Sequence, residues 1–477
     1  MFMKRFFEPK LAQASYVIGC PGARAAVVID ANRDIEQYIR AAEAEGVSIT
    51  HVTETHIHAD YVSGSRELAA RTGAQLLLSD EGDADWKYAF ASEAGATLLK
   101  DGDGFDVGAV RVDAVHTPGH TPEHLAFLIT DTAAAAEPIA LVSGDFIFVG
   151  DVGRPDLLEK AAKIVGTMEA GARTLYASLR RSDAWPEWLQ IWPGHGAGSS
   201  CGKGISAIPH STLGYERRFN WAFQMKSEDE FVAAVLAGQP EPPSYFAEMK
   251  RVNKVGPRLL HGFRRPDLLQ VNRLEAALRD GAVVVDTRPA AAFAAGHVPG
   301  TLNIPLNASF TTWAGWLLPY TADFYLIVDD SAGTLIDTAV RDLAMIGLDR
   351  IAGYFDSEVI DAWAEGERPL DTVPQITVHD LQASLAHHAV TLVDVRNDAE
   401  WAGGRIAGAT HISLGTVGDR VADIPTSKPI VLQCAAGARS AIAASVLKAK
   451  GLDNIINLIG GIGEWRKAGL PVEPASR

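Results

Sequence analysis

The chain contains few cysteines and no long apolar run. Only Cys20, Cys201 and Cys434 occur among its 477 residues, too few for a disulfide framework and typical of a reducing compartment. No apolar stretch approaches the length that spans a membrane, and the first residues do not resemble a signal peptide. These absences predict a cytoplasmic protein that does not bind a membrane.

Positive charge is also scarce. Lysine and arginine number 43 against 59 aspartates and glutamates, which gives a net charge of -16. Such a chain repels phosphate backbones, so we expect no nucleic-acid partner, and an anionic substrate would need local arginines. The 47% hydrophobic and 21% charged residues are typical of packed globular domains, and the length predicts about three of them.

Residues 1–250 are predicted to form the first domain, an α/β structure in which strands and helices alternate. The proline-rich stretch 238–245, GQPEPPSY, is typical of a linker at the end of such a domain. The expected elements are strands at 15–18, 25–29 and 48–52 and helices at 33–45 and 67–72.

An internal repeat follows the linker. Residues 283–305 read VVVDTRPAAAFAAGHVPGTLNIP, and residues 391–413 read TLVDVRNDAEWAGGRIAGATHIS. Each copy combines an apolar strand, a turn, an amphipathic helix and a second strand. The repeat predicts two successive α/β domains of one fold, at 262–370 and 375–477.

Histidines and carboxylates recur in short loops after apolar strands of the first domain. The segments are THIHAD at 55–60, HTPGH at 116–120, SGD at 143–145 and PGH at 193–195. Loops at strand ends can bring distant residues together, and imidazole and carboxylate groups are suitable ligands for Zn, Fe or Mn. One histidine alone would more often be an ordinary hydrogen-bonded residue, but the ordered set predicts a metal site.

This ordered set resembles the metallo-β-lactamase superfamily, whose fold is an αββα sandwich with the metal at one edge. The first motif of that family is usually HxHxDH, and Tyr61 stands here in place of its last histidine. In members with two metal ions, that histidine and the aspartate before it, here Asp60, serve the second ion. The resemblance therefore implies a single metal.

A closer resemblance, over about half of the chain, is to the persulfide dioxygenases of this superfamily. It is carried by SYVIGC, THIHADYVSGS, TPGHTPEH, SGDFIFVGDVGRPDL and WPGHGAGSSCGK. The resemblance implies one Fe(II) per chain, held by His56, His120 and Asp145. A two-histidine, one-carboxylate set leaves coordination positions open for substrate and dioxygen, whereas zinc hydrolases need an activated water.

Other residues of these motifs are expected around the metal. His58, Asp60 and His195 can orient ligands or hydrogen-bond to bound species. Arg154 can either anchor an anionic substrate or form a structural salt bridge. Cys201 follows His195 on a Gly/Ser-rich loop and is expected near the pocket without a catalytic role.

A second chemical motif lies at residues 430–440, IVLQCAAGARS. An apolar strand leads into a loop that starts with Cys434 and then into a helix. Backbone N–H groups at the helix start and the charge of Arg439 favour the thiolate, which is the nucleophile; the alternative is a buried structural cysteine. The loop that surrounds the sulfur comprises Ala435, Ala436, Gly437 and Ala438.

The segments around this loop, VDVR, GRIAGATHI and GGIGEW, resemble the rhodanese sulfurtransferases. The resemblance implies that Cys434 accepts a sulfane sulfur, becomes a persulfide and passes the sulfur on. The middle domain has the same framework, but YLIVDDSAGT at 325–334 puts Asp330 where the cysteine belongs. A carboxylate cannot form a persulfide, so we expect this domain to be an inactive spacer or docking surface.

Together these features predict a bifunctional sulfur enzyme. A low-molecular-weight persulfide, such as that of glutathione, would be oxidised by O₂ to sulfite and thiol, and Cys434 would exchange sulfur among persulfide, sulfite, thiosulfate and thiol. One alternative is a two-zinc thioester hydrolase of the glyoxalase II type, against which Tyr61 argues. Another is that the rhodanese half only binds or regulates. A homo-oligomer is compatible with the fold, although no segment identifies an interface.

Overall fold

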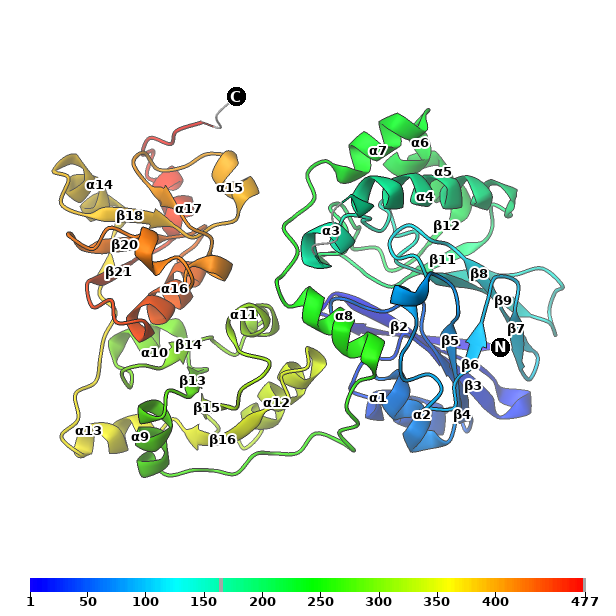
Figure 1. Cartoon of the computed structure of the whole chain (residues 1–477), viewed down its shortest axis with the longest axis horizontal. Coiled ribbons are helices and arrows are strands. Elements are labelled where there is room, and N and C mark those ends of the chain that lie inside the picture. The colour runs from blue at the N-terminus through cyan, green and yellow to red at the C-terminus, as the bar shows by residue number, and fades with distance from the viewer. Residues whose placement is uncertain (163–165, 475–477) are drawn as a thin grey trace. The chain divides into compact units, whose positions relative to one another are not determined.

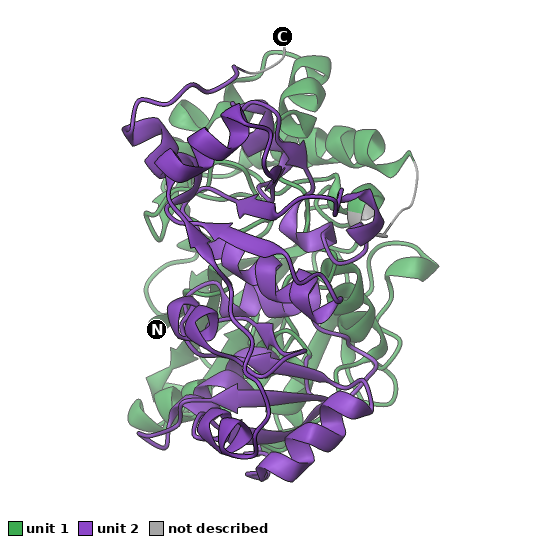
Figure 2. Ribbon diagram, turned by 90° about the vertical axis from the view of Figure 1, so that its left-hand side faces the viewer, with its two compact units in different colours: residues 1–263, 344–347 green, residues 264–343, 348–477 purple. Residues whose placement is uncertain are grey.

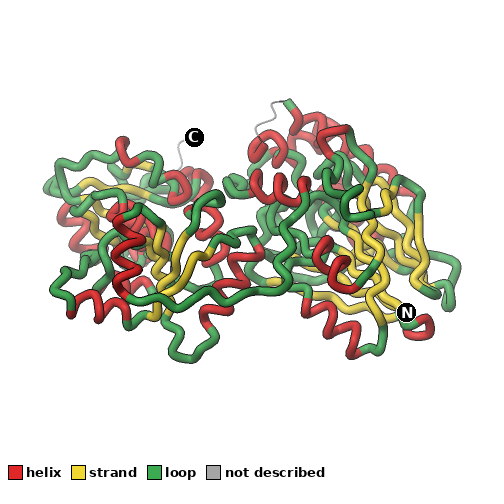
Figure 3. The backbone as a smooth tube through the Cα atoms, turned by 60° about the horizontal axis from the view of Figure 1, so that its bottom comes forward, coloured by secondary structure: helices red, strands yellow, loops and turns green. Residues whose placement is uncertain are grey.

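A computed structural model describes residues 1–162 and 166–474 (Figure 1). The chain divides into two compact units, shown in different colours in Figure 2. Unit 1 comprises residues 1–263 and 344–347, and unit 2 comprises residues 264–343 and 348–477. Both units mix helices and strands (Figure 3). Among the described residues, no helix is long and apolar enough to cross a membrane.

The first sheet of unit 1 has six strands that follow one another in chain order. Its first three strands are antiparallel, and the third to sixth are parallel. The second strand, QASYVIGC, is buried along its whole length, which suits its apolar and β-branched composition. The strands are β1 (Phe2–Glu8), β2 (Gln13–Cys20), β3 (Ala25–Ile29), β4 (Ser48–Thr53), β5 (Gln75–Ser79) and β6 (Thr97–Leu99).

The second sheet of unit 1 also has six strands, in the order β12-β11-β10-β9-β8-β7. Only the pair β10 and β11 is parallel. Strand β8 alternates buried and half-buried residues over most of its length, as expected for a strand with one face in the core. The strands are β7 (Gly104–Val107), β8 (Val110–His116), β9 (Leu125–Asp131), β10 (Ala140–Gly144), β11 (Gln190–Pro193) and β12 (Ser211–Thr212).

The two sheets face each other across an apolar core, where Val27 and Ile29 belong to the same buried cluster as Val112 and Phe127. Helices α1 and α2 cover the outer face of the first sheet, and α4 to α7 cover that of the second. The predicted αββα sandwich is thereby confirmed. The helices are α1 (Glu36–Ala44), α2 (Ser65–Thr72), α3 (Leu157–Ala162), α4 (Thr167–Arg181), α5 (Leu213–Phe219), α6 (Trp221–Gln224), α7 (Glu228–Leu236) and α8 (Phe246–Val255).

Helix α8 shows why unit 1 continues beyond the proline-rich stretch 238–245. Its side chains Phe246 and Met249 are buried. The Asn253 amide of the same helix donates hydrogen bonds to the carbonyl oxygens of His58 and Tyr61, at 2.8 and 2.7 Å. The change from unit 1 to unit 2 therefore comes after this helix, at residues 263–264.

Unit 2 contains two parallel sheets, in the orders β14-β13-β15-β16 and β17-β21-β20-β18-β19. Their central strands are short apolar runs buried on both faces, as is typical of parallel sheets covered by helices. The strands are β13 (Val283–Asp286), β14 (Leu302–Asn303), β15 (Phe324–Val328), β16 (Ile351–Asp356), β17 (Gln375–Ile376), β18 (Thr391–Asp394), β19 (Thr410–His411), β20 (Ile430–Gln433) and β21 (Ile455–Leu458).

The helices of unit 2 follow these strands, so each sheet belongs to an α/β module. We call residues 264–370 the middle module and residues 375–474 the last module. The helices are α9 (Val271–Arg279), α10 (Ala290–Ala295), α11 (Phe310–Leu317), α12 (Leu335–Met345), α13 (Val359–Glu365), α14 (Val378–Ala386), α15 (Asp398–Ala402), α16 (Ala438–Ala449) and α17 (Gly461–Lys467).

Candidate functional site

Two neighbouring sets of buried ligand-type side chains lie at strand ends in unit 1. In the first set, the ligand atoms of His56, His120 and Asp145 all lie within 4.8 Å of one another. These residues follow β4, β8 and β10, so the sandwich places them at one edge of its sheets. The structure thus brings together the three residues that the sequence predicted as iron ligands.

The second set consists of Asp60, His195 and Cys201, whose ligand atoms also lie within 4.8 Å of one another. All three are buried. A thiol therefore lies beside the aspartate and the histidine, in a chain whose first motif has Tyr61 in place of its last histidine. The sequence predicted that Cys201 lies near the pocket, and the structure places it among potential metal ligands.

The Asp145 carboxylate lies between the two sets. Its Oδ2 is 3.4 Å from His120 Nε2, and its Oδ1 is 3.4 Å from His195 Nε2. Neither oxygen of Asp145 or Asp60 accepts a hydrogen bond from the described part of the chain, although all four are buried. Buried carboxylates without partners are costly. The donor set therefore fits a bound cation.

Hydrogen bonds fix the rings of three histidines with Nε2 available for a metal. His56 Nδ1 is 2.9 Å from Thr55 Oγ1, His120 Nδ1 is 2.9 Å from the Arg154 carbonyl oxygen, and His195 Nδ1 is 3.1 Å from that of Ala12. A carbonyl oxygen can only accept, so Nδ1 of His120 and His195 carries the proton. Thr55 donates its own hydroxyl to Asp30 and accepts from His56.

The site keeps the imidazoles of His56 and His120 neutral. Burial lowers the pKa of His56 well below its ordinary value, and the neighbouring histidines lower it further. Burial likewise lowers the pKa of His120, against the opposing effect of Asp145. Neutral imidazole is the form that binds a metal. Burial, followed by Asp60 and Asp145, raises the pKa of the Cys201 thiol, so a cation is needed to favour its thiolate.

Asp30, at the end of β3, supports the site and was missed by the sequence motifs. It adopts a left-handed backbone conformation with φ 58°, which aspartate tolerates better than most residues. Its carboxylate accepts hydrogen bonds from the Thr55 backbone and from the His58 ring. Burial lowers the pKa of His58, but the carboxylates of Asp30, Glu54 and Asp60, with Asp30 the strongest of the three, together raise the pKa to about 9. His58 is therefore a partner of Asp30 rather than a member of either ligand set.

His124 and Gly144 orient Asp145 and were also not predicted. The Asp145 backbone N–H donates to His124 Nε2 at 3.0 Å. Gly144 has φ 50°, and a Cβ there would lie 2.6 Å from both His124 Nε2 and Thr55 Oγ1. Only glycine fits this turn. The motif segments TPEH and SGD contain these two residues, but only the fold shows that they meet.

Tyr61 and Arg154, which the sequence motifs place near the metal, both make structural contacts. The Tyr61 hydroxyl donates to the Asp30 carbonyl oxygen at 3.3 Å, and its ring packs on His58. Arg154 is fully buried; it binds both carboxylate oxygens of Asp156 at 2.8 Å and donates to two carbonyl oxygens. Of the two roles expected for Arg154, the structure supports the salt bridge, and the arginine has no exposed face for a substrate.

A separate candidate site lies in the last module of unit 2. Cys434 follows β20 and is buried. The Gly437 backbone N–H donates to the sulfur at 3.1 Å, and the Ser440 hydroxyl donates to it at 3.5 Å. Gly437 has φ 94° and directly precedes α16. The loop and the helix start thus aim donors at Cys434, as the sequence predicted for a reactive thiol.

The arginine in the first turn of α16 forms an ion pair. Arg439 donates to both carboxylate oxygens of Glu400, at 2.6 and 2.7 Å. The hydrogen bonds from Arg439 lower the pKa of Glu400, so this carboxylate is ionised. The predicted positive charge beside Cys434 is therefore neutralised by a partner that the sequence analysis did not identify.

Comparisons with known proteins agree with this architecture. Residues 9–184 match the metallo-beta-lactamase superfamily, and residues 270–356 and 377–468 match the rhodanese-like domain. A solved metallo-beta-lactamase structure from Staphylococcus aureus is 43% identical, covers 74% of this chain and 99% of its own, and has a TM-score of 0.68.

Two curated relatives differ in their named activities. A mitochondrial persulfide dioxygenase of Bos taurus is 28% identical over 49% of this chain and 79% of its own length. A hydroxyacylglutathione hydrolase of Rhodospirillum rubrum is 29% identical over 38% of this chain and 60% of its own length. Both are distant relatives of this chain.

Proposed function

Because this chain belongs to the metallo-beta-lactamase superfamily and continues into rhodanese-like domains, we propose that it is a persulfide dioxygenase joined to a sulfurtransferase. The observation that carries the proposal is the set His56, His120 and Asp145, two neutral imidazoles and one carboxylate. Such a set suits one Fe(II) and leaves other coordination positions free. When bound, iron would supply a site where the persulfide sulfur and O₂ are held side by side.

The chain's own residues prepare this site. Thr55 and the Arg154 carbonyl group hold the rings of His56 and His120, and His124 holds the backbone of Asp145. The overall reaction consumes R–S–SH, O₂ and H₂O and releases R–SH and H₂SO₃, which ionises to sulfite. The outer sulfur is oxidised, O₂ is reduced, and the S–S bond is broken. Glutathione persulfide is the substrate that we propose.

Cys434 supplies the second activity. Its thiolate accepts a sulfane sulfur from a persulfide or thiosulfate, and a thiol or sulfite then takes up that sulfur. The donors from Gly437 and Ser440 stabilise negative charge on the sulfur. The sulfite made at the first site is one acceptor for the second, which gives the fusion a chemical reason.

The test is metal content and oxygen uptake with glutathione persulfide on anaerobically purified protein. We expect one iron per chain, sulfite as the product, and loss of both iron and uptake in His120→Ala. His116→Ala is the matched control, because His116 lies in the same loop region, outside either ligand set, with Nε2 near the Pro122 carbonyl oxygen. Iron without oxygen uptake would contradict the proposal.

A second candidate is a two-metal hydrolase that acts on glutathione thioesters. The set Asp60, His195 and Cys201, next to the shared carboxylate of Asp145, supports it. Two zinc ions per chain, thioester hydrolysis and no oxygen uptake would establish this function instead.

A further inference from the structure

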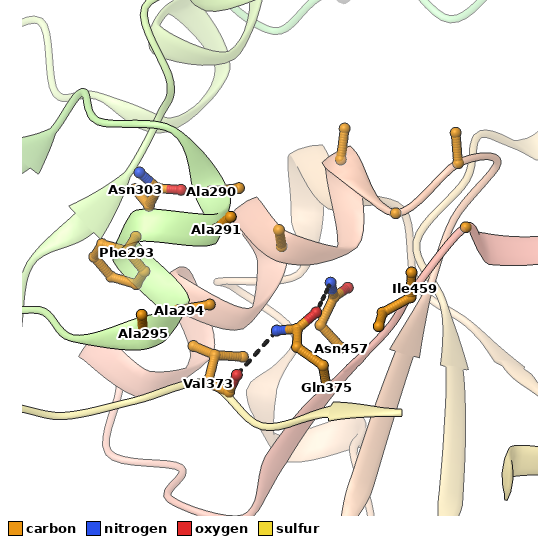
Figure 4. Close-up of a pocket in the computed structure, with 15 residues that line it drawn as sticks. Ala290, Ala291, Phe293, Ala294, Ala295, Asn303, Val373, Gln375, Asn457 and Ile459 are labelled. Carbon is orange, nitrogen blue, oxygen red and sulfur yellow. Dashed lines mark hydrogen bonds between the residues drawn. The ribbon is translucent and has the colours of Figure 1, made fainter. Parts of the chain in front are cut away.

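A cavity of about 610 Å³ in unit 2 borders the loop of Cys434 (Figure 4). Ala436, Gly437 and Ala438 of the loop line it, together with Ile459 and Gly460 after β21. The middle module forms the opposite wall through α10, where Ala290, Ala291 and Ala294 line the cavity. The module without a cysteine thus forms part of a pocket beside the cysteine of its neighbour.

One buried amide in this pocket has a free acceptor. Gln375 Nε2 donates to the Val373 carbonyl oxygen at 2.9 Å, and Asn457 Nδ2 donates to Gln375 Oε1 at 2.9 Å (Figure 4). Because a carbonyl oxygen can only accept, these two hydrogen bonds fix the orientation of both amides. Asn457 Oδ1 is left buried, without a hydrogen-bond partner in the described part of the chain.

A second amide is held in the same way. Asn303 lines the cavity from the middle module and is fully buried. Its Nδ2 donates to the carbonyl oxygens of Asp286 and Arg288, both at 2.9 Å. These two bonds also fix the amide, and Asn303 Oδ1 has no partner among the described residues. The wall of the pocket therefore holds two buried acceptors without partners among the described residues, and a ligand that satisfies them must supply N–H or O–H donors.

The pocket is unsuited to anions. None of the described residues that line it is charged. The nearby Arg439 is already paired with Glu400. A carboxylate placed here would lose its hydration without gaining a cation, and it would face oxygen acceptors. The small apolar side chains and the amide oxygens of the wall instead match an uncharged ligand that contains amide groups.

We infer that this pocket binds a neutral, amide-bearing thiol and directs its sulfur to the Cys434 loop. The inference rests on the proposed sulfur transfer and specifies its substrate class. The ligand's thiolate attacks the outer sulfur of the Cys434 persulfide. A new S–S bond forms on the ligand, the bond to Cys434 breaks, and the electron pair stays on the cysteine sulfur, which takes the ligand's proton. No oxidant is needed.

The test compares two acceptors that differ in one group, N-acetylcysteine amide and N-acetylcysteine. The full-length protein is first loaded with sulfur at Cys434, and cyanide release of thiocyanate measures the loading. We expect kcat/KM for the neutral amide to exceed that for the carboxylate by about tenfold after correction for thiolate fraction. No loading would contradict the proposed function itself; loading without this preference would overturn only the inference about the pocket.

A charge added to the wall makes the test independent of intrinsic thiol reactivity. Ala291→Arg places a cation at the pocket, on an exposed position of α10. It should shift the ratio of the two kcat/KM values about tenfold toward N-acetylcysteine. Ala292→Arg is the matched control, because Ala292 is exposed on the same helix and is not one of the residues that line the cavity. Equal ratios in both variants would overturn the inference.

Asn457→Leu tests the acceptor directly. This variant removes Oδ1 while retaining similar bulk, and KM for N-acetylcysteine amide should rise about tenfold with little change in kcat. An unchanged KM for the amide would contradict the role of Asn457.

Discussion

The middle and last modules of unit 2 share a frame and differ in a loop. In the frame, Arg288 Nε lies 3.0 Å from both carboxylate oxygens of Asp286, and Arg396 Nε lies 3.0 Å from both oxygens of Asp394. Each arginine also donates to a glycine carbonyl oxygen further along the chain, that of Gly296 or Gly404. The same contacts hold the ends of β13 and β18.

The loops that connect β15 to α12 and β20 to α16 use their backbone N–H donors differently. In the middle module, Asp330 Oδ1 accepts from the backbone N–H groups of Leu335 and Ile336, at 2.8 and 3.2 Å. In the last module, the Gly437 N–H donates to the Cys434 sulfur. The strand register corrects the prediction that Asp330 stands where the cysteine belongs. Ile327 pairs with Asp286 as Gln433 pairs with Asp394, so Val328 occupies the position of Cys434 and Asp330 lies two residues further on. A valine side chain cannot form a persulfide either. The two modules therefore share the frame and differ in this loop, which contains a cysteine only in the last module.

The largest expected effect is the loss of sulfur transfer when the cysteine of the last module is replaced. Cys434→Ser should reduce sulfur transfer at least about 1,000-fold, because the nucleophile is removed. Transfer of sulfur to cyanide measures this loss, and oxygen uptake should not change. Cys20→Ser is the control, since Cys20 lies in unit 1. Transfer that survives in Cys434→Ser would mean that the last module is also a binding domain only.

The next largest effect is a loss of local stability when an Asp–Arg pair of the frame is broken. Asp394→Asn leaves the buried Arg396 without an ionised partner and should cost about 3 kcal/mol of local stability. Asp286→Asn should cost less, because the side chain of Arg288 is 13% exposed and that of Arg396 only 3%. Native-state hydrogen exchange of β18 and β13 measures both losses. Equal losses would show that burial does not distinguish the two frames.

A smaller effect is expected from the cap of α12. Asp330→Ala removes the acceptor for two backbone N–H groups and should lower local stability by about 1–2 kcal/mol. Hydrogen exchange at the start of α12 reports this change, while sulfur transfer stays unchanged. Asp329→Ala, at the exposed neighbouring position, serves as the control. Unaltered exchange in Asp330→Ala would contradict the capping role.

The smallest effect is expected from the ion pair beside Cys434. Glu400→Gln keeps a side chain that can cap α15 but frees the charge of Arg439, so kcat/KM for thiosulfate should rise about threefold. Asp398→Asn makes the same change in net charge on the same helix without touching this pair. A similar rise in both variants would point to a general effect of charge rather than to Arg439.

Much of the fold was predictable because its strands are apolar runs. The strand predicted at 25–29 coincides with β3, and the one at 48–52 lies within β4, Ser48–Thr53. The helix predicted at 33–45 is observed at Glu36–Ala44. Ends shift by a few residues because caps and turns, rather than apolar periodicity, decide where a helix begins.

The site was predictable only where ligand types repeat in short motifs. His56, His120 and Asp145 lie in such motifs after strands and meet in space. Asp30 does not, because its role depends on a left-handed turn and on contacts with residues far along the chain. The pairing of Glu400 with Arg439 likewise joins two elements whose approach no local pattern encodes.

The wall that α10 contributes to the cavity beside Cys434 has an evolutionary consequence. A duplicated module that has lost its cysteine is free to drift only where it serves no other purpose. Here, substitutions on one face of α10 alter the lining of a cavity beside the Cys434 loop, so selection on the last module extends to the middle module. Natural variation in the middle module should therefore be restricted at Ala290, Ala291 and Ala294 and freer at Ala292.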